Sequence, residues 1–387
     1  MKRTFFISRE MVKTDSKVKI SALLLCLMLI GALVAACGGG REAESDHTVS
    51  ASTAEDDAST VLPEPAVRAV TDGSGKTVEI PHQVSSIAAS GALNQIVLML
   101  GGGDRLVATA EGVQKGFFTV VYPRIKEIPA AYTGSGPGTL NMETLLQAQP
   151  QVVFGSFNEK DAETLETAGI AMLGLSLNDP EDIKNTIALV GKVLGPEGEK
   201  KAVQFSSYYD ENLKYVSDIT KSAKKVRVFI AAGDGASGPV ATTPGKDIHT
   251  SYIEAAGGVN IAAEKFPVAP AGGSATVDFE FLIGEQPDVI VAQSRAVYDY
   301  ITDEGNGSQW QKLNAVKEKR VYLTPKGVYL WSVRSAEGAL QPLWLAKVLH
   351  PDLLKELSLE QSVKEFYKEY YYYDLSDSET EGILNPK

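Results

Sequence analysis

Cysteine and histidine are both scarce in this chain of 387 residues, which has two cysteines and four histidines. Cys26 lies in an apolar N-terminal stretch and Cys37 directly follows that stretch, so the rest of the chain has no cysteine for a disulfide. A site for bare zinc or manganese uses several imidazole or carboxylate ligands, which so few histidines do not favour. We therefore expect a fold that rests on its hydrophobic core, with no histidine-rich metal centre.

Basic residues are also fewer than acidic residues. The chain has 37 Lys and Arg against 49 Asp and Glu, for a net charge of −12. Residues 1–36 carry six Lys or Arg and two Asp or Glu, so the net charge of residues 37–387 is −16. An acidic surface repels nucleic-acid phosphates, and no segment resembles a basic stripe. We predict no nucleic-acid partner.

Sequence signatures of catalysis are missing as well. The glycine-rich run at residues 233–238 lacks the lysine and the serine or threonine of a phosphate-binding loop. The sequence has no nucleophile elbow and no metalloprotease helix motif. We predict a protein that is not an enzyme and that holds no intrinsic cofactor.

At the N-terminus, a basic leader precedes an apolar run from Ile20 to Ala36. The last four residues of this run and the cysteine that follows it, residues 33–37, read LVAAC. This resembles a bacterial lipoprotein signal, because the run is shorter than the roughly 20 residues of a membrane span and stops at small residues before a cysteine. We expect cleavage after residue 36 and two acyl chains on Cys37, which anchor the protein stably to the outer face of a membrane. An uncleaved transmembrane anchor is the alternative, and Met11 is an alternative start.

The remaining sequence divides into a tether and two lobes. Residues 37–66 are rich in Ser, Ala, Thr, Asp and Glu, which predicts a disordered tether. From residue 67, short apolar strands alternate with helical patterns, as in parallel βα units. The alternation stops at residues 199–222, which contain no Gly or Pro and repeat apolar residues at helical spacing, and it then resumes. This predicts an α/β fold of two Rossmann-like lobes, 67–198 and 223–387, with central parallel sheets, one long connecting helix and a ligand cleft between the lobes.

The segments of both lobes, in this order, resemble the helical-backbone class of ABC-transporter substrate-binding proteins. The first lobe contributes 84–87 (VSSI) and 141–153 (NMETLLQAQPQVV), and the second contributes 225–229 (KVRVF), 245–260 and 279–290. The resemblance covers nearly all of the chain after residue 67. It implies a receptor outside the cytoplasm that delivers iron-siderophores, haem, vitamin B12, or some metals or oxyanions to an ABC permease dimer with its ATPase.

Two glutamates, Glu143 and Glu280, occupy matching places in the two lobes, each on a short helix before a Pro-containing turn and an apolar strand. In the family that this chain resembles, glutamates at these positions form salt bridges with arginines of the permease. One exposed charge on each lobe gives two-point docking, since charges of this kind set orientation and association rate. The alternative is a pair of solvated helix glutamates without a partner.

The ligand is expected at the loops that follow the strands, between the lobes. Two of these loops, 117–124 and 326–334, combine aromatic side chains with a guanidinium, which bury flat ligand surface and hold anionic groups. The predicted ligand-binding residues are Phe117, Phe118, Tyr122, Tyr329, Trp331 and Arg334. Packing roles are the alternative for Tyr329 and Trp331, and a surface ion pair is the alternative for Arg334.

We expect the ligand to be a metal chelate: a ferric siderophore, haem or a corrinoid. His249 is the one histidine near the expected cleft and is a candidate axial ligand, with a helix-start or core role as the alternative. A molybdate or tungstate oxyanion is a second ligand class, and a surface sensor or enzyme on the same scaffold is an alternative of another kind. We expect a monomer, and we expect the aromatic tail at residues 366–373 to dock on the second lobe.

Overall fold

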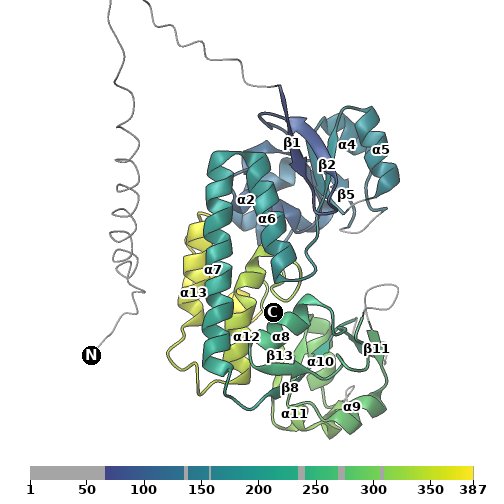
Figure 1. Cartoon of the computed structure of the whole chain (residues 1–387). Coiled ribbons are helices and arrows are strands. Elements are labelled where there is room, and N and C mark those ends of the chain that lie inside the picture. The colour runs from purple at the N-terminus through teal and green to yellow at the C-terminus, as the bar shows by residue number, and fades with distance from the viewer. Residues whose placement is uncertain are drawn as a thin grey trace, which may run out of the picture. The chain divides into compact units, whose positions relative to one another are not determined.

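A computed structural model describes residues 66–134, 138–156, 158–233, 240–268, 275–305 and 309–386 (Figure 1). The expected signal sequence, Cys37 and the tether lie outside the described residues, as do parts of the glycine-rich runs 134–138 and 233–238. No helix in the described ranges is long and apolar enough to cross a membrane.

The N-terminal lobe is built on a parallel sheet of five strands in the order β5-β4-β3-β6-β7. Helices connect successive strands, and β3 and β6 are buried along their whole length, as expected for a sheet covered on both faces. An antiparallel hairpin precedes the sheet. The elements are β1 (Val67–Thr71), β2 (Thr77–Pro81), β3 (Ile87–Ala89), α2 (Leu93–Met99), β4 (Leu106–Ala110), α3 (Phe118–Val121), β5 (Ala130–Tyr132), α4 (Met142–Ala148), β6 (Val152–Gly155), α5 (Glu159–Thr167) and β7 (Ala171–Gly174).

Two adjoining helices, α6 (Pro180–Leu194) and α7 (Pro196–Thr220), follow this sheet (Figure 1). The 25 residues of α7 extend over about 37 Å at ~1.5 Å per residue. The sequence predicted 199–222, but the helix begins at Pro196, because proline has no N–H to lose in the first turn of a helix. At Gly191 an added Cβ would lie 2.7 Å from the Gly198 carbonyl oxygen, so this close approach of α6 and α7 requires glycine.

The C-terminal lobe has a parallel sheet of four strands in the order β10-β8-β12-β13. A separate antiparallel pair, β9 and β11, lies beside it. The elements are β8 (Val226–Ala231), β9 (Val240–Thr242), α8 (Ile248–Ala255), β10 (Gly258–Asn260), β11 (Ala275–Val277), α9 (Phe279–Glu285), β12 (Val289–Ala292), α10 (Arg295–Thr302), α11 (Asn314–Lys317), β13 (Val321–Leu323), α12 (Gln341–Leu349), α13 (Leu359–Tyr370) and α14 (Asp377–Leu384). Two parallel sheets joined through a long helix confirm the predicted fold class.

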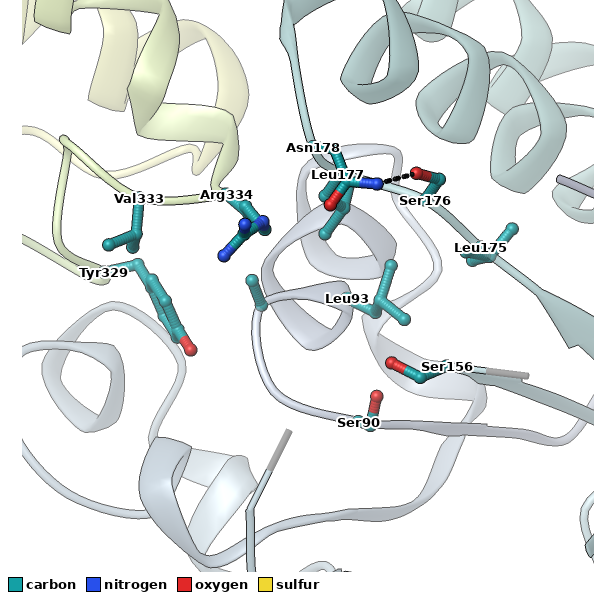
Figure 2. A pocket seen from close by; sticks show the side chains of 11 residues that line it. Ser90, Leu93, Ser156, Leu175, Ser176, Leu177, Asn178, Tyr329, Val333 and Arg334 are labelled. Atoms are coloured by element: carbon teal, nitrogen blue, oxygen red, sulfur yellow. Dashed lines mark hydrogen bonds between the residues drawn. The ribbon is translucent and has the colours of Figure 1, made fainter. Parts of the chain in front are cut away.

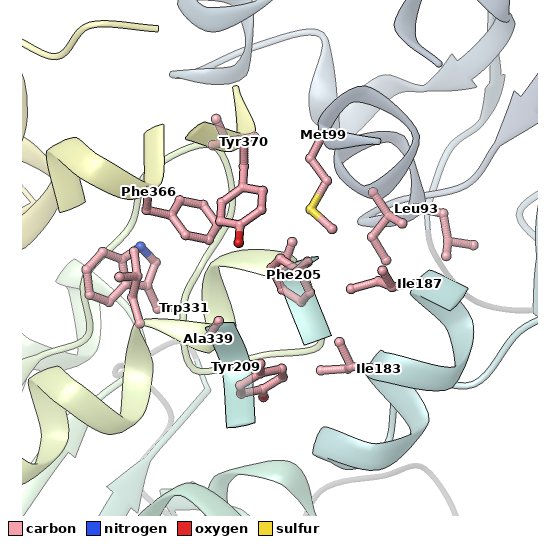
Figure 3. Packing of buried hydrophobic residues seen from close by; sticks show 14 of the residues in the cluster. Leu93, Met99, Ile183, Ile187, Phe205, Tyr209, Trp331, Ala339, Phe366 and Tyr370 are labelled. Atoms are coloured by element: carbon pink, nitrogen blue, oxygen red, sulfur yellow. The ribbon is translucent and has the colours of Figure 1, made fainter. Parts of the chain in front are cut away.

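The buried hydrophobic residues of the described chain form three clusters. The central cluster crosses from the N-terminal sheet over α7 to the C-terminal sheet, and Phe205 and Tyr209 of α7 lie within it (Figure 3). An outer cluster of the C-terminal lobe includes Leu282 of α9, and an outer cluster of the N-terminal lobe includes Leu145 of α4. The two lobes therefore share their largest hydrophobic core.

The aromatic tail packs differently from the sequence expectation. Phe366 and Tyr370 of α13 lie against α7, with the Tyr370 ring centroid 5.3 Å from that of Phe205. The Tyr367 ring contacts Phe117 of the N-terminal lobe at 5.9 Å between centroids. The tail thus adds to the central cluster and reaches both lobes, because Phe366 and Tyr370 share the face of α13 that meets α7, whereas Tyr367 lies about 100° around the helix from Phe366.

Candidate ligand-binding cleft

A cavity of about 580 Å³ lies where the two lobes face each other (Figure 2). Its N-terminal lobe lining comes from the segments just beyond β3, β6 and β7, at the carboxyl ends of parallel strands, where ligands bind in open α/β sheets. The C-terminal lobe contributes the segment between β13 and α12. The lining residues are Ser90, Ala92, Leu93, Ser156, Leu175, Ser176, Leu177, Asn178, Tyr329, Val333 and Arg334.

A buried asparagine shapes the loop that carries Ser90. The Asn94 side chain donates to the carbonyl oxygens of Ala89 at 2.8 Å and Gly91 at 3.0 Å. Its amide oxygen accepts from the Thr109 hydroxyl at 2.7 Å. Since all of these groups are buried, each hydrogen bond is costly to lose, and the Ser90 loop is held in one conformation.

A buried glutamate shapes the loop that carries Tyr329. The Glu337 carboxylate accepts from the backbone N–H of Tyr329 at 2.6 Å and of Val328 at 3.3 Å, and also from the Tyr367 hydroxyl. Across the lobes, Gln95 of α2 donates to it at 3.2 Å. Burial raises the pKa of Glu337 to about 7, although these four hydrogen bonds act in the opposite direction. Glu337 thus fixes the backbone of Tyr329 and ties it to the N-terminal lobe.

Arg334 lines the cavity and gives it a positive charge. Its guanidinium lies 3.4 Å from Asp247, and 49% of its side chain remains exposed, so part of it is free to contact a ligand. Burial acts to raise the pKa of Asp247, but hydrogen bonds from His249 and the charge of Arg334 outweigh it, and the pKa is lowered. Asp247 therefore stays ionised and holds Arg334 in place. None of the described residues that line the cavity carries a carboxylate, whereas several carry hydroxyl or N–H donors.

The structure places the predicted ligand-binding residues in different surroundings. Tyr329 and Arg334 line the cavity together (Figure 2). Phe117 lines a second cavity of about 520 Å³, which shares Tyr329 and also includes Lys115 and Lys326.

Three of the predicted contacts reach neither cavity. Phe118 and Trp331 have no exposed surface, and the Tyr122 hydroxyl donates to the carbonyl oxygen of Gly103 at 2.9 Å. They are packing residues in the structure, because the apolar rings turn into the core beneath the loops that carry them.

Both ring nitrogens of His249 also form hydrogen bonds with neighbouring side chains. Its Nδ1 bonds to Asp247 and its Nε2 to the Gln293 side chain. Because the carboxylate requires a proton on Nδ1, Nε2 accepts from the amide, and neither nitrogen is free to bind a metal. No group of three or more candidate metal ligands occurs among the described residues. The expectation of His249 as an axial ligand does not agree with this geometry.

Sequence reasoning missed Ser156 and Asn178, which enter the cavity beyond β6 and β7. Both strands were expected at nearly these positions, so the rule that places ligands at strand ends would have found them. It also missed Asp247 and Glu337 as positioning residues. No local pattern indicates their long-range contacts, because Arg334 lies 87 residues from Asp247 and Gln95 lies 242 residues from Glu337.

Glu143 and Glu280 occupy equivalent exposed positions. Each lies in the first turn of a seven-residue helix, α4 or α9, and both helices end at a glutamine in the left-handed conformation. The side-chain oxygens of Asn141 and Asp278 cap the two helices. The two lobes thus present the same local structure around an exposed carboxylate.

Two α/β lobes with a cavity at their facing strand ends define a two-lobed binding protein. Residues 87–328 match the family described as Periplasmic binding protein, and the chain belongs to this family. It is therefore an extracytoplasmic substrate-binding protein of the ABC-transporter type.

Relatives and solved structures show the same architecture. The molybdate-binding protein MolA of Haemophilus influenzae is 24% identical over 337 residues, which cover 79% of this chain and 91% of MolA. The structure of MolA bound to molybdate has a TM-score of 0.69 at 22% identity, and it covers 80% of this chain and 99% of its own. A periplasmic solute binding protein from Veillonella parvula has a TM-score of 0.71 at 24% identity (82% and 97% coverage). Helicobacter pylori CeuE with Ni(II) bound has a TM-score of 0.66 at 21% identity (82% and 99% coverage).

Proposed function

We propose that this protein captures an anion, of the molybdate or tungstate class, and delivers it to an ABC permease. The observation that carries the proposal is the lining of the 580 Å³ cavity, whose described residues offer hydroxyl groups and the Arg334 guanidinium but no carboxylate. Such donors bind oxyanions, and a guanidinium grips two oxygens at once. The molybdate-binding relative supports this class of ligand.

An anionic metal chelate, such as a ferric siderophore, is the second candidate. The observation that favours it is the second cavity of about 520 Å³, which shares Tyr329 with the first and adds Phe117 and two lysines. Cavities of this size suit ligands of several hundred daltons. Haem and corrinoids are less favoured than the sequence predicted, because Phe118 and Trp331 are buried and leave few aromatic faces for a flat ligand.

Ligand titration separates the two candidates. Molybdate and tungstate are expected to bind the full-length protein, purified in detergent, with one site and micromolar or tighter affinity in calorimetry. Ferric siderophores, haem and cobalamin are then expected to leave the tryptophan fluorescence unchanged. Saturable quenching by one chelate, with no heat from either oxyanion, would move the assignment to the second candidate. Sulfate is the matched control, since it has the same charge and shape but shorter bonds.

Glu143 and Glu280 are proposed as the docking charges for the permease. Reversal of both, Glu143→Lys with Glu280→Lys, is expected to abolish ligand uptake by cells while ligand affinity of the isolated protein stays unchanged. Each glutamate is exposed on a separate lobe, so its loss affects the docked geometry and not the cleft. Reversal of Glu356, which is exposed but lies on neither α4 nor α9, is the control and should leave uptake intact. Normal uptake by the double variant would contradict the docking role.

Anchoring through a lipid on Cys37 completes the proposal. Radiolabelled palmitate is expected to enter the protein in a bacterial host, and Cys37→Ser is expected to prevent labelling and release the protein from the membrane fraction. Labelling of the serine variant would show that the anchor lies elsewhere.

A further inference from the structure

One buried hydroxyl near the cleft has no hydrogen-bond partner. The Tyr132 hydroxyl, at the end of β5, is inaccessible to solvent and unpaired among the described residues. Tyr132 as a whole is 5% exposed. An unpaired buried hydroxyl destabilises the folded protein, so its presence needs an explanation.

The same hydroxyl lies close to Gly155, at the end of β6. A Cβ built on Gly155 would lie 3.6 Å from the Tyr132 hydroxyl oxygen and 3.7 Å from the Ser90 Oγ. Two hydroxyls from different strand ends therefore face the position that a side chain at residue 155 would fill. Ser90, and Ser156, which follows Gly155 in the sequence, both line the 580 Å³ cavity (Figure 2). We call the position that a side chain at residue 155 would fill the Gly155 notch.

We propose that the Gly155 notch receives one oxygen of the bound anion, which accepts hydrogen bonds from Tyr132 and Ser90. The inference rests on the proposed function and assigns Tyr132 as a specificity-determining residue. A hydrogen-bond acceptor suits the notch, because the phenol keeps its proton and can donate it. Burial, and to a lesser extent the negative charge of Asp161, raise the pKa of Tyr132. Arg334 then holds the remaining oxygens on the opposite side of the cavity.

Two substitutions test the notch from different directions. Tyr132→Phe removes the hydroxyl and is expected to weaken molybdate binding at least tenfold in calorimetry, while the melting temperature of the ligand-free protein stays the same or rises. This combination is informative, because loss of a structural hydrogen bond would lower the melting temperature. Gly155→Ala fills the notch with a methyl group at ordinary contact distances and is expected to weaken binding by a similar or larger factor.

Gly284→Ala is the matched control. Gly284 lies in α9, which packs on the outer cluster of the C-terminal lobe, and its added Cβ would meet no atom within 4 Å, so molybdate affinity should stay at the wild-type value. Circular dichroism and thermal melts of all variants establish that they are folded, and if one variant misfolds the other still decides the question.

The outcomes distinguish the notch from the proposed function. Wild-type affinity for molybdate in both folded variants would overturn the notch and leave the anion receptor standing. Absence of molybdate and tungstate binding by the wild-type protein would overturn the proposed ligand class and the notch with it. Weaker binding by both variants, with no loss of thermal stability for Tyr132→Phe, supports the notch.

Discussion

Replacing Arg334 by alanine is expected to weaken oxyanion binding about 100-fold, or roughly 2.7 kcal/mol, which is within the range for hydrogen bonds to charged groups. Arg334 is the only cation among the described residues that line the 580 Å³ cavity, and about half of its side chain is exposed. An anion in the cavity of Arg334→Ala would keep its hydroxyl contacts and lose its charge partner. Isothermal titration with molybdate measures the loss directly.

Arg334→Lys and Arg295→Ala complete this experiment. The lysine variant keeps the charge but not the two-pronged geometry, so we expect an intermediate affinity. Arg295 pairs with Asp299 on the surface of α10 and lines neither cavity, so its loss should leave binding unchanged. If Arg334→Ala binds molybdate as tightly as wild type, the cavity is not the anion site.

The second large effect concerns the dependence of stability on pH. Burial raises the pKa of Glu337 to about 7 in the folded protein, against 4.5 for a glutamate in water. The folded state therefore binds this proton more tightly than the unfolded state does between these two values. The free energy of unfolding is expected to fall as the pH rises from 4.5 to 7, by about 3 kcal/mol from this group, and this contribution is then constant above pH 7.

Glu337→Gln isolates that contribution because glutamine does not titrate. Urea unfolding at pH 5, 6, 7 and 8 is expected to show a difference in stability between wild type and variant that changes by up to about 3 kcal/mol across this range. The variant can be less stable at every pH, since an amide nitrogen does not accept hydrogen bonds from Tyr329 and Val328. The change with pH is therefore the decisive quantity. Glu356→Gln, at an exposed site, should show no such change, and a flat difference for Glu337→Gln would contradict the expectation.

The sequence predicted more of the fold than of the cleft. Alternation of apolar runs and helical patterns depends on local spacing, and it predicted the parallel sheets apart from their edge strands β5 and β10, and the long helix α7 apart from its first turn. Arg334 and Tyr329 were expected in the cleft because they follow the carboxyl end of strand β13, where ligands bind in parallel sheets, and both line the cavity.

The other residues of the cleft could not be predicted, because their roles depend on the orientation of each side chain and on contacts with residues far away in the sequence. Trp331 is two residues from Tyr329, yet its ring is buried, whereas Tyr329 lines the cavity. An irregular loop has no periodicity that predicts which side chain turns inward. Gln95 and Glu337 meet across 242 residues of sequence, which no local pattern records. The unpaired hydroxyl of Tyr132 is likewise visible only once β5 and β6 are placed in one sheet.

The arrangement of the three hydrophobic clusters also bears on which parts of the protein open most easily. Local opening proceeds in cooperative units, and a helix that packs on a small separate cluster can detach while the main core stays intact. Helices α4 and α9 pack on the two outer clusters, whereas α7, α12 and α13 share the central one. The segments that carry Glu143 and Glu280 can therefore adjust to a partner without disturbing the central core that joins the lobes.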